Sequence, residues 1–452
     1  MKEGHIWPVV IYDLYAYRCY RMILFAYLSL TVFTEGAVAL RELIDPKITH
    51  EYEVEPAVTE IYSDNRITLL HNGDAYFPVL EEALDRAEHG IFLETYIFEN
   101  DHTGRRIAEA LRRAALRGVK THLLIDGFGS SGLPKTMIDY LEEAGVMVLL
   151  YRPHISPWTL RRRRLRRLHR KIVVVDLRMA FVGGMNIIDD MEIPGQDSPR
   201  YDYAVSVEGQ LVKEIYASSR RLWARAVWSH RLRLVWNRDH QRPDPPPESA
   251  GHMRSAFLVR DNFRHRRDIE NAYLQAIDQA QSEIILANAY FLPGLNFRHA
   301  LMAAAGRGVR VVLLLQGKIE YRLAHYASRA LFGNFLDAGI EVYEYHQSIL
   351  HAKVAVIDEH WATVGSSNLD PFSLLLALEA NIVVDDRNFA LALKDSLGQA
   401  IKAGARRISE NNWRSQPIML RLLCWLSYGL IRFMTGIAGY APTSRPKTPG
   451  RQ

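Results

Sequence analysis

The chain is poor in cysteine. Cys19 and Cys424 are the only cysteines among 452 residues, and neither has a second Cys, or a His at zinc-ligand spacing, near it. The sequence therefore predicts neither a secreted fold held by disulfides nor a structural zinc site, and we infer a reducing compartment. The sequence predicts no metal site and no other cofactor.

Long apolar runs are also scarce. Residues 22–33 are apolar for 12 positions before Glu35 follows, which is short of the about 20 residues that a membrane-spanning helix needs. This segment of the N-terminal extension fits an interfacial or buried helix. A transmembrane or signal segment, or a non-native extension from an early start codon, are the alternatives.

A second apolar run, residues 418–440, is long enough to span but contains Arg421 and Arg432. At 100° per residue these two, with Trp425 and Tyr428, lie near one helix face. The pattern predicts an amphipathic helix in the membrane plane, with this face at headgroup level. The leucines expected in the acyl region are Leu420, Leu423 and Leu430. The alternative is an ordinary helix packed on the protein core.

Positive charge is concentrated in one place. The formal net charge is only +5, yet residues 161–170, RRRRLRRLHR, contain seven Arg. Such a run predicts a polyanionic partner, either nucleic acid or an anionic lipid surface. A solvated basic loop without a partner is the alternative.

The remaining pattern indicates a globular α/β protein with an internal duplication. Apolar strand-like runs at 67–70, 91–98, 119–126 and 146–151 alternate with helix-like segments such as 103–116. RGVKTHLLIDG from Arg117 is mirrored by RGVRVVLLLQG from Arg307. The predicted parts are an extension (1–60), a first domain (61–236), a Pro-rich linker (237–252), a second domain (253–410) and an amphipathic membrane-interacting segment with tail (411–452).

Each half carries one copy of a histidine-centred motif, HRKIVVVD from His169 and HAKVAVID from His351. In both copies a Gly follows the His by 14 positions and an Asn by 17. The apolar runs fit buried strands, but packing does not require His, Lys, Asp and Asn at fixed offsets. The first copy consists of His169, Lys171, Asp176, Gly183, Gly184 and Asn186; the second consists of His351, Lys353, Asp358, Gly365, Ser366 and Asn368.

These residue types suit phosphodiester chemistry at one site between the halves. Lys171, Lys353, Asn186 and Asn368 can hold non-bridging oxygens. One His can attack phosphorus while the other protonates the leaving oxygen and later deprotonates an incoming alcohol, without a metal.

Each His also needs a carboxylate that fixes its tautomer. The candidates are Asp202, 33 positions after His169, and Glu379, 28 positions after His351; surface carboxylates are the alternative. Asp176 and Asp358 belong to the motif and to the candidate catalytic set. Their positions at strand ends suit capping of backbone amides, or pairing with Lys or Arg across the domain interface.

The paired motifs resemble the HKD signature of the phospholipase D superfamily. WATVGSSNLDPFSLLLALEANIVV from Trp361 and NAYFLPG from Asn288 resemble its bacterial cardiolipin synthase branch, over about residues 66 to 410. The chain lacks the clear pair of N-terminal transmembrane helices of some members and so is similar to the shorter type. The resemblance implies two α/β/α sandwich domains with one active site at their interface.

It also implies phosphatidyl transfer between two phosphatidylglycerols, giving cardiolipin and glycerol through a phosphatidyl-histidine. His169 is then the expected nucleophile and His351 the acid/base, although the residues alone leave the order open. The expected partners are phosphatidylglycerol and a membrane surface, with no nucleic acid or protein partner. The expected location is the cytoplasmic face of the inner membrane. A hydrolytic phospholipase D, a nuclease or phosphodiesterase, and a non-catalytic membrane-binding protein are the alternatives.

Overall fold

A computed structural model describes residues 60–153, 166–191, 198–229, 250–261, 265–370 and 377–437. The apolar segment at 22–33, the first half of the arginine run (161–165) and nearly all of the Pro-rich linker lie outside these residues. Every structural statement below concerns the described part of the chain.

The first half is an α/β unit built on seven strands of one sheet in the order β1-β8-β7-β6-β2-β3-β4. Strands β2, β3 and β4 are parallel, and the others pair antiparallel with their neighbours. The strands are β1 (Tyr62–His71), β2 (Gly90–Thr95), β3 (Lys120–Asp126), β4 (Met147–Tyr151), β6 (Lys171–Val175), β7 (Met179–Gly183) and β8 (Tyr203–Glu208), and the helices are α3 (Asn72–Asp85), α4 (His102–Leu116), α5 (Lys135–Glu143) and α7 (Leu211–Ser229).

The second half repeats this plan, which confirms the predicted duplication. Its sheet order is β9-β15-β14-β13-β10-β11-β12-β16, and only β16 has no counterpart in the first half. The strands are β9 (Met253–Arg260), β10 (Glu283–Asn288), β11 (Arg310–Gln316), β12 (Glu341–Tyr345), β13 (Lys353–Ile357), β14 (Trp361–Gly365), β15 (Ala377–Asp385) and β16 (Ala405–Ile408), and the helices are α8 (Asp268–Gln279), α9 (Leu295–Gly306), α10 (Arg322–Arg329), α11 (Phe332–Asp337), α13 (Arg387–Gly404), α14 (Glu410–Arg414) and α15 (Ile418–Ile437).

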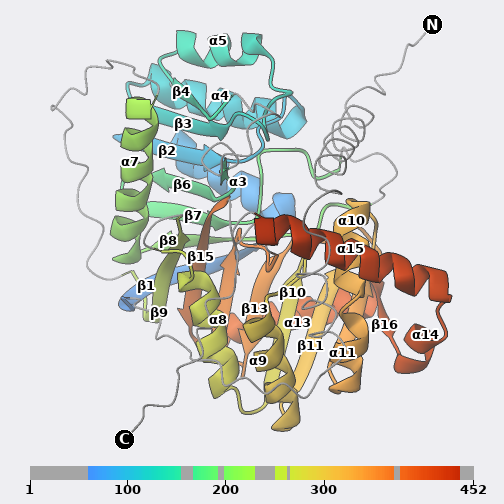
Figure 1. Ribbon diagram of the computed structural model, residues 1–452. Helices are drawn as coiled ribbons and strands as arrows, with labels where there is room; N and C mark the ends of the chain where they lie inside the picture. Colours follow the sequence, from blue (N-terminus) through green and yellow to red (C-terminus); the bar gives the residue numbers. More distant parts are fainter. Residues whose placement is uncertain are drawn as a thin grey trace, which may run out of the picture.

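The two sheets join edge to edge through β1 and β9, so one continuous sheet runs through both halves (Figure 1). Helices α7 and α13 share one apolar core that includes residues of both halves. The opposite face is covered separately, by α3, α4 and α5 in the first half and by α8, α9 and α11 in the second. The halves are thus α/β/α layers with a common central core, which fixes their motifs relative to each other.

Short segments also cross between the halves. Strand β5 (Arg167–Leu168), just before the first motif, pairs in parallel with Ala377 and Leu378 of β15. Tyr201 forms the corresponding parallel bridge with Leu350, just before the second motif. Each motif histidine is therefore held against the backbone of the opposite half.

Candidate active site

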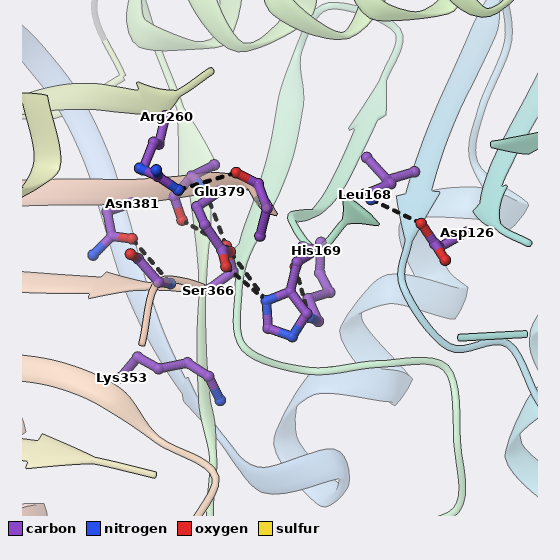
Figure 2. A network of polar contacts seen from close by, with 12 residues as sticks. Asp126, Leu168, His169, Arg260, Lys353, Ser366, Glu379 and Asn381 are labelled. Carbon is purple, nitrogen blue, oxygen red and sulfur yellow. Dashed lines mark hydrogen bonds and ion pairs between the residues drawn. The ribbon is translucent and has the colours of Figure 1, made fainter. Parts of the chain in front are cut away.

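The first motif histidine is oriented by a carboxylate of the second half. The His169 Nδ1 atom lies 2.9 Å from Oε1 and 3.1 Å from Oε2 of Glu379, which is fully buried on β15. The backbone amide of His169 donates to the carbonyl of Leu378, at 3.0 Å. Figure 2 shows the imidazole facing Glu379.

The second histidine has the reciprocal arrangement. The His351 Nδ1 atom lies 2.6 Å from Oδ2 of Asp202, which directly precedes β8. The backbone amide of His351 donates to the carbonyl of Tyr201 at 2.8 Å, and that of Tyr201 donates to the carbonyl of Ile349 at 2.9 Å. Asp202 also accepts the amide of Tyr203, so its position is fixed from both sides.

The carboxylates are crossed between the halves. Along the sequence, Asp202 follows His169 and Glu379 follows His351, but the structure pairs Asp202 with His351 and Glu379 with His169. Neither half alone contains a histidine with its carboxylate. The site is consequently shared, and its geometry depends on the joined sheet.

The two motif lysines are buried beside the histidines. The Lys171 ammonium donates to the carbonyl of His169 at 2.6 Å, and the Lys353 ammonium contacts both the carbonyl and Nδ1 of His351, the latter at 2.9 Å. Burial lowers the pKa of Lys171 to about 7 and that of Lys353 to about 8. Each ammonium also lowers the pKa of both motif histidines. A bound anion would favour the charged form of both lysines.

Both histidines favour the neutral form. Burial lowers the pKa of His169, although the charge of Glu379 raises it in part. Burial also lowers the pKa of His351 well below its usual value, and the positive charges of Lys353, Arg200 and Lys171 add to this effect. With Nδ1–H directed at a carboxylate, each neutral ring has its Nε2 lone pair available.

The motif asparagines lie at the same sheet end as the lysines. In the first hairpin Lys171, at the start of β6, pairs with Gly183, at the end of β7, and in the second Val354 pairs with Val364. The chain that leaves each hairpin is therefore next to the start of β6 or β13, and Asn186 and Asn368 lie on this part of the chain. Both are buried. Asn186 Oδ1 accepts the amide of Ile97 at 3.1 Å, which leaves its NH₂ group as a donor.

The structure corrects the inclusion of Asp176 and Asp358 in the catalytic set. They lie at the far ends of β6 and β13, where each begins a hairpin turn with two consecutive positive φ angles. Asp176 accepts the backbone amides of residues 88–90, and Asp358 those of residues 281–283, at 2.7 to 2.9 Å. Of the two structural roles considered, the capping of backbone amides is the one observed, and it occurs within each half.

The position after the motif glycine was not assigned a role from the sequence, but in each copy it lies beside one of the two carboxylates. The Ser366 hydroxyl donates to Glu379 Oε2 at 2.5 Å, and it accepts the amide of Ala380 (Figure 2). At the equivalent Gly184, a Cβ would lie 2.3 Å from Oδ1 of Asp202. In the sequence, the difference between Gly184 and Ser366 at equivalent motif positions could have indicated that this position has a role in the site.

A further pair of residues holds the backbone before each motif histidine. Asp126, at the end of β3, accepts the amide of Leu168 at 2.8 Å (Figure 2). Gln316, at the end of β11, accepts the amide of Leu350 at 3.2 Å. These two end the mirrored segments LLIDG and LLLQG, so the duplication itself marked their equivalence.

Metal-ligand clusters do not occur among the residues that the structure describes: no group of three or more His, Cys, Asp or Glu side chains is suitably arranged.

The predicted membrane contacts divide into exposed and buried residues. Arg421 is exposed, Trp425 and Arg432 are half-buried, and Tyr428 is buried under the Arg298 guanidinium, 5.9 Å from its ring centroid. The assignment of Tyr428 to the headgroup face is therefore wrong, because the stripe through Cys424, Tyr428 and Ile431 packs on the second-half core. None of the described helices is both long and apolar enough to cross a membrane.

The exposed side of α15 is apolar over its first turns apart from Arg421. Ile418 is 80% exposed, Met419 75% and Leu426 63%, and Leu422 and Leu423 are also exposed. The helix lies across the second half beside α10 (Figure 1). Its amphipathic pattern thus separates a face on the protein core from an exposed apolar face.

Two α/β halves that share one site with paired histidines and lysines define a phospholipase D-like protein. A family model described as cardiolipin synthase, PLD-like domain, matches residues 80–215 and 273–400. The chain belongs to this family.

Curated relatives agree with this family. Cardiolipin synthase B of Shigella flexneri is 38% identical over 392 residues, covering 85% of this chain and 92% of the relative. A probable cardiolipin synthase of Bacillus subtilis is 31% identical, covering 77% and 71%. Among solved structures, phosphatidylserine synthase of Haemophilus influenzae has a similar fold, with TM-score 0.60 and 14% identity, over 90% of this chain and 99% of that chain.

Proposed function

We propose that this protein is a cardiolipin synthase, a phosphatidyltransferase that joins two phosphatidylglycerol molecules and releases glycerol. The observation that carries the proposal is the shared site, in which two histidines with crossed carboxylates lie beside two buried lysines. The names of the relatives support phospholipid substrates. The geometry supports two-step transfer through a covalent histidine.

In the first step, Nε2 of His169 attacks the phosphorus of the donor lipid. The bond from phosphorus to the glycerol oxygen breaks, and His351 in its protonated form gives its proton to that oxygen. Glu379 accepts the Nδ1–H of His169 and stabilises the charge that develops on the ring. The products are glycerol and a phosphatidyl-His169 intermediate.

In the second step, the hydroxyl of the acceptor lipid gives its proton to His351, and its oxygen attacks phosphorus. The bond between phosphorus and His169 breaks, cardiolipin forms, and His351 is protonated for the next cycle. Two in-line displacements retain configuration at phosphorus. The scheme uses no metal or cofactor.

The lysines and asparagines are proposed to hold the non-bridging oxygens in both steps. Lys171 and Lys353 are buried, so their charges are little screened by solvent, and Asn186 has a free amide donor. Binding of the phosphodiester would raise the pKa of both lysines and of His351. Substrate binding therefore favours uptake from solvent of the proton that His351 needs as the acid.

The assignment of His169 as nucleophile is supported by the electrostatics. Burial lowers the pKa of both histidines, but the charge of Glu379 raises the pKa of His169 in part, whereas Lys353 and Arg200 add to the lowering at His351. The more basic imidazole is the better nucleophile, and the less basic one is the stronger acid once protonated.

We further propose that the exposed apolar face of α15 inserts into the interfacial region of the inner membrane on its cytoplasmic side. Ile418, Met419, Leu422, Leu423 and Leu426 form this face, which a monomer in water would leave uncovered. Such attachment is peripheral. It would hold the site close to lipid headgroups.

The test is product analysis with vesicles that contain labelled phosphatidylglycerol. Purified protein should form cardiolipin and glycerol, and His169→Ala and His351→Ala should each abolish both products. Phosphatidic acid as the main product would instead identify a hydrolytic phospholipase D. Circular dichroism of each variant would check that it remains folded.

Attachment is tested separately by vesicle sedimentation. Leu422→Asp with Leu426→Asp should weaken vesicle binding by about 10-fold or more, because each buried Leu contributes about 1.5 to 3 kcal/mol. Leu116→Asp is the matched control, since Leu116 is 61% exposed on α4, in the other half of the chain. Equal binding by both variants would exclude α15 as the attachment face.

A further inference from the structure

Arg200 lies at the active site but outside both motifs. It is two residues before Asp202, on the segment whose next residue, Tyr201, pairs with the backbone at Ile349 and His351 of the second half. This pairing carries Arg200 across the boundary between the halves. No sequence pattern had singled it out.

The Arg200 guanidinium has no partner among the described residues. No carboxylate oxygen there lies within 4 Å of it, and its Nε is buried without a hydrogen-bond partner. The nearby carboxylates are otherwise engaged: Asp202 contacts His351 and Tyr203, and Asp190 accepts the amide of Gly73 at 2.8 Å. A half-buried guanidinium in this state has donors available for an anion that is not part of the protein.

The charge of Arg200 acts on one side of the site. It lowers the pKa of His351, of Lys353 and of Tyr290. Tyr290 follows β10 of the second half, and its hydroxyl donates to Glu320. Arg200 thus lies near the histidine that we assign to the leaving and incoming oxygens.

The duplication shows that this charge is an asymmetric addition. The amide of His351 is accepted by the carbonyl of Tyr201, and the amide of His169 by that of Leu378, so the residue equivalent to Arg200 is Ala377. The reacting phosphorus already has one lysine from each half. Because Ala377 gives the His169 side no cation at this position, the guanidinium of Arg200 indicates a second anion next to His351.

We propose that Arg200 binds the phosphate of the acceptor lipid, so that the site selects an acceptor that is itself a phosphodiester. This inference rests on the proposed function and deepens it. In phosphatidylglycerol the reacting hydroxyl is separated from that lipid's own phosphate by the three glycerol carbons. When the hydroxyl is at His351, this phosphate must lie outside the lysine pair but close to it. Water and simple alcohols have no group for Arg200 to bind.

The experiment compares two acceptors of one phosphatidyl-enzyme. Vesicles of phosphatidylglycerol are incubated with labelled glycerol, and both cardiolipin and labelled phosphatidylglycerol are measured. The labelled lipid arises by reversal of the first step, so it needs the same donor chemistry but an acceptor without phosphate. Arg200→Gln should reduce cardiolipin formation by about 10- to 100-fold relative to glycerol exchange, as expected for a lost charged hydrogen bond.

Two variants make the result specific. Arg200→Lys keeps the charge without the planar fork and should give an intermediate ratio. Arg254→Gln, which removes an exposed Arg paired with Asp385, should leave the ratio unchanged. A parallel loss of both products in Arg200→Gln would overturn the inference, because Arg200 would then support the reacting phosphate or the fold. So would an unchanged ratio. Absence of both products in the unaltered protein would refute the proposed function itself.

Discussion

The crossed carboxylates predict which half of the protein controls which chemical role. Glu379→Gln keeps the size of the side chain but removes the charge that lies 2.9 Å from His169 Nδ1. An amide NH₂ directed at Nδ1 would move the imidazole proton to Nε2, the atom that must attack. Loss of the correct tautomer in comparable triads costs about 10⁴-fold in kcat, so we expect a loss of about 10³- to 10⁴-fold, or roughly 4 to 5.5 kcal/mol.

An activated donor separates the two roles. A phosphatidyl ester of p-nitrophenol has a leaving group that needs no protonation, so its burst reports attack by the nucleophile alone. Glu379→Gln and His169→Ala should both suppress this burst. Asp202→Asn and His351→Ala should largely retain it and yet fail to make cardiolipin from phosphatidylglycerol.

The test is which carboxylate variant behaves like which histidine variant. If Glu379→Gln behaved like His351→Ala, and Asp202→Asn like His169→Ala, each carboxylate would serve the histidine of its own half and the crossed arrangement would be refuted. If the crossed pairs held but the burst depended on His351, the structure would stand and the assignment of the nucleophile would reverse.

Three further predictions follow from burial. Asp358→Asn should lower the free energy of unfolding by about 1 to 3 kcal/mol in chemical denaturation, because backbone amides lose a charged acceptor, while cardiolipin formation per folded molecule persists; loss of activity without loss of stability would contradict the capping role. Lys353 has a pKa of about 8 when folded, below the unfolded value, so the unfolded state binds more protons above pH 8 and stability should rise with pH. Between pH 8 and 10.5 the free energy of unfolding of Lys353→Met should rise by roughly 3 kcal/mol less than that of the unaltered protein. Equal rises in the two proteins would contradict the lowered pKa of Lys353. The pH profile of kcat/KM should fall above about 7, as Lys171 loses its charge, and below about 6, as Asp202 is protonated; a flat profile from pH 5 to 9 would exclude these groups.

Much of the site was predictable because the motif is local. The offsets from His169 to Lys171 and Asn186 reflect one hairpin, in which alternation along β6 and β7 sets the positions of the side chains. The same hairpin recurs at His351. The strand ends also indicated the capping role of Asp176.

The pairing of Asp202 with His351 could not be predicted from spacing. It depends on β1 joining β9 and on the bridge between Tyr201 and Leu350, which are contacts between residues far apart in the chain. Arg200 was missed for the same reason, since its position relative to His351 arises from that bridge. On α15 the helical period was read correctly, but periodicity does not tell which face the protein itself covers, and Tyr428 proved to be buried.

The sequence by itself determined the α/β duplication and the chemical groups that each half supplies, because these are encoded in local periodicity and in a repeated motif. Only the tertiary structure decided that each histidine takes its carboxylate from the other half and that Arg200 of the first half lies on the His351 side of the site. The physical reason is that hydrogen bonds within a hairpin are fixed by local register, whereas contacts between halves depend on how two sheets and their shared core pack together.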